Sequence, residues 1–82
     1  MKHYVLFSVE VPERTQHDKW QSWMQFHNDT LNRPKPAEGI RRLGENVWLL
    51  DRDSKADVLV SLGAAAAEQG LKYAVLFLKD DA

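Results

Sequence analysis

The sequence contains no cysteine, and this absence limits both its chemistry and its architecture. Disulfide bonds, thiolate zinc sites, iron–sulfur ligation and a cysteine nucleophile are all excluded, and a reducing compartment fits this composition. Glycine and proline are also scarce, with four and three residues, which excludes collagen-like and low-complexity classes. No apolar run approaches the roughly 18 residues that a membrane span needs, and no signal-peptide pattern opens the chain. We therefore expect a cytoplasmic protein that makes no membrane contact.

The sequence also lacks an excess of charge of one sign and lacks the common catalytic motifs. Eleven Lys and Arg against twelve Asp and Glu give a net charge of -1, so any attraction to nucleic acid must be local. There is no P-loop, dinucleotide-binding glycine pattern, zinc-protease motif, calcium loop or serine-hydrolase elbow. The sequence predicts no cofactor and no metal site.

The 82 residues are 44% hydrophobic, enough for one folded domain over residues 1–82. Residues 2–11 are rich in β-branched and aromatic side chains and predict a strand that ends at Pro12. Residues 15–31 have helical spacing, with Thr15 and Asp18 forming a capping-box-like pair. The apolar stripe of this helix is predicted to contain Trp20, Trp23, Met24, His27 and Leu31, with Phe26 at its margin.

The second half of the sequence repeats this alternation. Residues 40–43 and 47–50 predict a hairpin around Gly44, and the prolines within residues 32–36 separate it from the first helix. A second helix follows, with Ser54 as its cap and Gly70 as its stop, and residues 71–78 predict a last strand. The order β-α-β-β-α-β predicts an α+β, ferredoxin-like fold, in which two helices cover one face of a four-stranded antiparallel sheet.

Three of the predicted strands are apolar on both faces, although helices can cover only one face of such a sheet. Leaving the second face in water would forgo roughly 1.5–3 kcal/mol for each large side chain. A second copy packed sheet to sheet would cover it, and a flat platform for single-stranded nucleic acid is the alternative. We expect a homodimer whose interface contains Tyr4, Leu6, Trp48, Leu50, Leu76 and Leu78.

Basic residues concentrate between the two predicted helices and form the best local candidate for contacts with RNA or DNA phosphates. Guanidinium groups bind phosphate oxygens in pairs, which favours such a role. Charge that protects an edge strand from aggregation explains Arg41 and Arg42 equally well. The candidate contact set is Arg33, Lys35, Arg41, Arg42 and Arg52.

Three carboxylates could take part in chemistry. Asp51 and Asp53 have the oxygen ligands that a divalent ion needs, but their place before a helix favours capping. Glu10 stands at the end of the first strand, where a two-fold axis could bring two copies together, and an ordinary strand-end charge is the other interpretation. Glu10 is the one catalytic candidate.

Three stretches, KHYVL at residues 2–6, ENVWLL at 45–50 and DSKADVL at 53–59, resemble a set of small bacterial ferredoxin-like proteins. These proteins are related to the CRISPR adaptation endoribonuclease-like subunit and to the antitoxin endoribonuclease of type V toxin–antitoxin pairs. The resemblance implies a sheet-to-sheet homodimer and, in some members, metal-dependent cleavage of nucleic acid by an acid at the end of strand one. Here Val9 occupies that position, and Glu10 points to the opposite face of the strand.

Three functions are compatible with these patterns. The first is a non-catalytic homodimeric module that binds a macromolecule, either a protein or a nucleic acid, through the basic set. The second is a metal-dependent endoribonuclease that uses Glu10, with Asp51 or Asp53 assisting. The third is a dimeric α+β barrel enzyme for a small molecule, which would place His17, His27 or Trp23 in a closed pocket.

Overall fold

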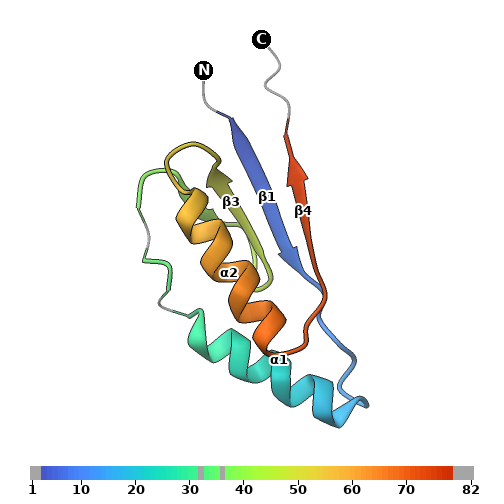
Figure 1. The fold of residues 1–82 in the computed structure, drawn as a ribbon. Helices are drawn as coiled ribbons and strands as arrows, with labels where there is room; N and C mark the ends of the chain where they lie inside the picture. The colour runs from blue at the N-terminus through green and yellow to red at the C-terminus, as the bar shows by residue number, and fades with distance from the viewer. Residues whose placement is uncertain (1–2, 32, 36, 79–82) are drawn as a thin grey trace.

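The order of secondary-structure elements is the predicted one, β-α-β-β-α-β. A computed structural model describes residues 3–31, 33–35 and 37–78. The elements are β1 (Tyr4–Val9), α1 (His17–Asp29), β2 (Ile40–Arg42), β3 (Val47–Asp51), α2 (Ala56–Glu68) and β4 (Tyr73–Phe77). The strands form one antiparallel sheet in the order β2-β3-β1-β4, which confirms the α+β ferredoxin-like fold (Figure 1). No helix within the described ranges is long and apolar enough to cross a membrane.

The hydrophobic core lies between one face of the sheet and the two helices. Val5 pairs with Leu50 and Phe7 with Trp48 across β1 and β3, so these side chains share one side of the sheet. Side chains of α1 and α2 pack against this side, and each large apolar residue removed from water contributes about 1.5–3 kcal/mol. The core cluster comprises Phe7, Val9, Trp23, Phe26, Trp48, Leu50, Leu62, Ala66 and Leu71.

The first helix buries a slightly different stripe from the one that its spacing predicts. Phe26, expected at the margin, is only 1% exposed, whereas Met24 and Leu31 are exposed. Phe26 meets Trp48 edge-on, with ring centroids 6.0 Å apart and planes at 89°, an arrangement that aromatic pairs favour. The phase of the helix is therefore set by this tertiary contact.

Neither helix begins at its predicted cap. The N-caps are Gln16 and Lys55, and neither makes a side-chain capping hydrogen bond. The Thr15 hydroxyl donates to the Glu13 carboxylate instead, at 3.4 Å. Before α2, the Asp51 carboxylate accepts backbone N–H groups of Asp53 and Ser54, so the turn is organised by Asp51 and not by Ser54.

The second helix ends as the sequence predicts, and it contacts the side chain of Tyr73 in β4. Gly70 adopts φ +70°, a conformation natural to glycine, and the Leu71 N–H donates to the Ala66 carbonyl in the manner of a Schellman cap. Gly63 faces Tyr73, since a Cβ placed on Gly63 would lie 3.6 Å from the Tyr73 ring. The absence of a side chain on Gly63 therefore lets α2 lie against the ring of Tyr73, the first residue of the edge strand.

Candidate interaction surface

The side of the sheet that faces away from the helices carries large apolar side chains. Leu6 of β1 lies between Leu49 of β3 and Leu76 of β4, while their sequence neighbours point toward the helices. The same alternation assigns the remaining positions of each strand. We call this side the open face, and it comprises Tyr4, Leu6, Ser8, Arg41, Val47, Leu49, Asp51, Ala74, Leu76 and Leu78.

Two of the residues predicted for the dimer interface do not lie on the open face. Trp48 is 1% and Leu50 0% exposed, and both point into the core between the sheet and the helices. Their placement in the interface is therefore wrong, because the pairing of Phe7 with Trp48 fixes the phase of β3. Val47 and Leu49 occupy the open face in their place.

The four other predicted interface residues do lie on the open face, and water reaches them. Leu76 is 58% exposed and Leu78 is also exposed, while Tyr4 and Leu6 are partly exposed. Both helices pack on the opposite side of the sheet (Figure 1). An apolar surface of this kind favours contact with another molecule.

Arg42 is held within the fold and is not available for phosphate binding. Its Nη1 donates to the Thr30 carbonyl and its Nη2 to the Glu45 carbonyl, both at 2.8 Å, and its Nε donates to the Gly44 carbonyl at 3.1 Å. The guanidinium also lies over the Trp48 ring, 4.8 Å from its centroid. The assignment of Arg42 to the contact set is therefore corrected: this residue joins the hairpin to the end of α1.

The other members of the predicted basic set are spread around the molecule. Arg41 lies on the open face opposite Leu49, whereas Arg52 lies between β3 and α2 with its Nε 3.8 Å from the Asp53 carboxylate. Lys35 is exposed in the connection between α1 and β2. Only Arg41 of the predicted set is on the open face, so the structure does not gather these residues into one basic patch.

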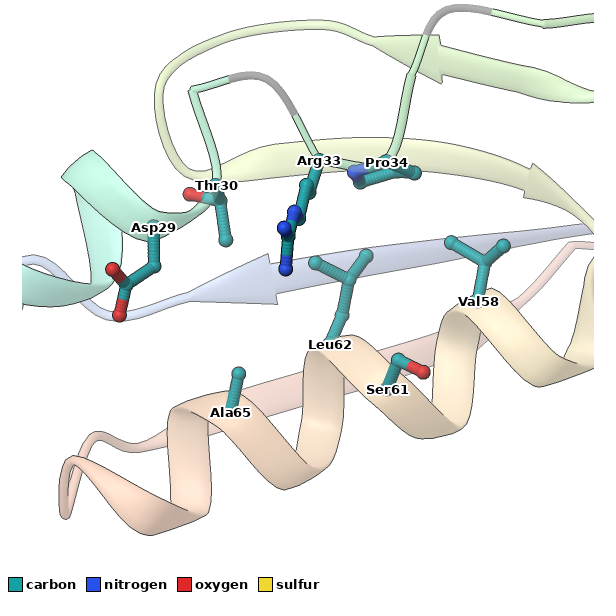
Figure 2. A pocket seen from close by; sticks show the side chains of 8 residues that line it. All are labelled: Asp29, Thr30, Arg33, Pro34, Val58, Ser61, Leu62 and Ala65. Atoms are coloured by element: carbon teal, nitrogen blue, oxygen red, sulfur yellow. The ribbon is translucent and has the colours of Figure 1, made fainter.

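Arg33 projects into a cleft between the end of α1 and α2 (Figure 2). The cleft has a volume of about 830 Å³, with Asp29 and Thr30 on one side and α2 on the other. Its α2 wall is mostly apolar and consists of Val58, Ser61, Leu62 and Ala65. An exposed arginine over an apolar wall can attract a negatively charged group, but the side chains that line the cleft include no nucleophile–base pair of the kind that catalysis needs.

Glu10 is exposed directly after β1, and the neighbouring depressions contain the basic residues Lys19 and Lys72. Within residues 3–31, 33–35 and 37–78, no three His, Asp or Glu side chains come together in a way that could hold a metal ion. Asp51 is engaged in its turn through the N–H groups of Asp53 and Ser54. The predicted assistance from Asp51 or Asp53 therefore has no counterpart in the geometry around Glu10.

The histidines do not line a closed pocket among the described residues. His17 is exposed at the start of α1, while His27 stacks on Trp23 with ring centroids 5.6 Å apart. The His27 Nδ1 atom is buried and has no hydrogen-bond partner in the described part of the chain. The depression beside His27 is shallow, with a volume of about 420 Å³, and it also contains Arg42. The pocket that the barrel-enzyme hypothesis needs is not found there.

Comparisons with protein-family models, with curated proteins and with solved structures find no match to this chain. The resemblance to the CRISPR-adaptation and antitoxin proteins therefore remains a prediction. The surface residues that sequence reasoning missed are Val47 and Leu49. Once one residue of β3 is known to lie in the core, the alternation of side chains along the strand places both residues on the open face.

Proposed function

We propose that the protein is a small, non-catalytic interaction module that works as a homodimer. The observation that carries this proposal is the exposure of large apolar side chains on the open face and along β4, including Leu76 and Phe77. Contact with a second copy removes such side chains from water, and each contributes roughly 1.5–3 kcal/mol when fully buried. Two-fold association is the commonest way in which one surface is covered by its own copy.

Light scattering on the full chain tests the homodimer. At micromolar concentration we expect a mass twice the 9.5 kDa of one chain. Because burial of apolar surface drives the association, the dimer should persist when salt is raised to about 1 M, where the Debye length is near 3 Å. A particle with the mass of one chain across this range would contradict the proposal.

The open face is also the best place for a nucleic acid, if the macromolecular partner is one. Tyr4 and Arg41 border one depression of this face together with Leu49, which offers a ring for stacking and a guanidinium for phosphate. Binding of single-stranded RNA should then weaken steeply with salt and fall in Arg41→Ala. Arg14→Ala, which removes an exposed arginine near α1, is the control and should leave binding unchanged.

A further inference from the structure

The edge strand β4 exposes apolar side chains on both of its faces. Leu76 is 58% exposed on the open face, and Tyr73 and Phe77 are 46% and 62% exposed on the helix side. A second copy that lay only against the open face would leave Tyr73 and Phe77 in water. The exposure of both faces points to a contact at the edge itself.

The backbone of β4 limits how that edge can pair. The Leu78 N–H donates to the Tyr4 carbonyl, and the Glu10 N–H donates to the Lys72 carbonyl. Since antiparallel bonding alternates along a strand, the even-numbered residues of β4 bond to β1. Tyr73, Val75 and Phe77 therefore direct their N–H and C=O groups away from the sheet, and β4 is its last strand.

These outward groups determine the geometry of self-pairing. Hydrogen bonds between two β4 strands must join odd-numbered residues of one copy to odd-numbered residues of the other. The antiparallel register that pairs Tyr73, Val75 and Phe77 of both copies places Val75 opposite the Val75 of the second copy. Tyr73 then lies opposite the second Phe77. Residues directly opposite each other in an antiparallel pair point to the same side of the sheet. The helices of both copies must therefore lie on one side of a continuous eight-stranded sheet.

The flank of α2 beside β4 fits this arrangement. At 100° per residue, Ala56, Val60, Gly63 and Ala67 form one stripe, and Gly63 places this stripe beside Tyr73. Val60 is 70% exposed and both alanines are exposed, whereas α1 and the cleft of Figure 2 lie on the other flank. In the register described above, the two α2 flanks would face each other over the paired strands.

The charge and the size of this surface agree with a second copy as its occupant. No charged residue occurs in β4 or in the stripe, so two identical surfaces would meet without repulsion. With roughly 150–200 Å² for a large apolar side chain, the exposed fractions of Val60, Tyr73, Leu76, Phe77 and Leu78 amount to roughly 400–550 Å² per copy. The total of roughly 800–1,100 Å² is the size of a weak, reversible interface, below the about 1,200 Å² of stable complexes.

We propose that two copies pair antiparallel through β4 about Val75, with their helices on the same side. This inference rests on the proposed homodimer and specifies its interface. It leaves the open face accessible on both copies, as one uninterrupted surface for a macromolecular partner. It also changes the role of Leu76 and Leu78, which then lie beside the paired edge and not at the centre of a face-to-face contact.

Single cysteines test the register, because the chain has no cysteine of its own. In the proposed register the two Val75 Cα atoms are about 5.5 Å apart, within the range of a disulfide. Under a mild oxidant, Val75→Cys should form the covalent dimer at least about tenfold faster than Ala74→Cys or Leu76→Cys, whose Cα atoms would lie beyond about 7 Å from their own copies. Fastest cross-linking of Leu49→Cys would instead indicate face-to-face packing and overturn the inference.

Charge at the exposed positions gives a second test that does not disturb the core. Phe77→Lys and Val60→Lys should each raise the dimer Kd by about tenfold or more, because they place charge in an apolar contact. Leu49→Lys on the open face is the matched control and should leave the dimer Kd within about threefold. A wild-type dimer that resists Phe77→Lys and Val60→Lys overturns the edge pairing but leaves the homodimer standing. A wild-type monomer overturns both.

Discussion

The two edges of the sheet are built in opposite ways. At one edge, β2 has three residues, two of them arginines, and Arg42 ties the strand to the end of α1 and to its own hairpin turn. At the other edge, β4 has five uncharged residues and leaves three sets of backbone groups directed outward. Short length and charge are the usual means of keeping an edge from pairing. The edge at β2 therefore has both of these means of protection, whereas β4 has no charged residue and is longer.

The largest effect should come from removing the protection of β2. Arg42→Ala loses three hydrogen bonds to carbonyls and the contact with Trp48. We expect the free energy of unfolding in urea to fall by about 2–4 kcal/mol. A hydrogen bond to a charged group contributes a net of about 1.5–3 kcal/mol, and two of the three bonds are exposed to solvent, so the full sum is not reached. Arg41→Ala, the exposed neighbour on the same strand, should change it by less than about 0.5 kcal/mol. Equal effects of the two changes would show that the arginines protect the edge by charge alone.

A smaller effect should follow from giving β4 the charge that β2 already has. Leu76→Lys places an ammonium group on the open side of the edge strand, where the leucine is largely exposed. The free energy of association at this edge should become weaker by about 1 kcal/mol. Light scattering should then detect the dimer only at a several-fold higher protein concentration. The unfolding midpoint in urea should hardly move. Loss of folding in this variant would mean that Leu76 contributes to the core, contrary to its exposure.

The smallest effect concerns the helix that borders β4. Gly63→Ala adds a methyl group 3.6 Å from the Tyr73 ring, an ordinary van der Waals contact. Alanine is better than glycine inside a helix by about 1 kcal/mol, so the free energy of unfolding should rise by about 0.5–1 kcal/mol. Ala64→Gly, one residue further along α2 and exposed, should lower it by a similar amount. A destabilised Gly63→Ala would indicate a closer packing of α2 on β4 than 3.6 Å.

Much of the fold could be predicted from sequence because its local signals agree with its topology. The strand-like composition of β1, the proline-rich stop after α1 and Gly70 after α2 together give the order of six elements. The placement of Tyr4, Leu6, Leu76 and Leu78 on the side away from the helices also agrees with the strand pairing. Both strands are apolar on both faces, so their composition alone does not show which side meets the helices.

The residues that were misplaced lie where the sequence has no alternation. In β3 four apolar residues follow one another, so the sequence does not show which of them point toward the helices. The pairing of Trp48 with Phe7 of β1 decides this. Arg41 and Arg42 look equivalent in the sequence. The pairing of Arg42 with Trp48 places Arg42 on the helix side of the sheet and Arg41 on the open face. Phe26 was misjudged for the same reason, because its burial depends on Trp48 and not on helical spacing. The position of Trp48 in the core therefore determines the orientation of β3, the side to which Arg42 points and the burial of Phe26.

Thr30 gives the connection between α1 and β2 a fixed starting point. Its buried hydroxyl donates to the Phe26 carbonyl at 2.8 Å, while its own carbonyl accepts the Arg42 guanidinium. The chain from there to Ile40 begins and ends on anchored residues, so its length matters little to the domain, and each doubling of a loop costs only about 0.6 kcal/mol. An epitope tag or a fluorescent reporter inserted beside the exposed Lys35 should be tolerated, which would make this segment a practical handle for labelling the molecule away from β4.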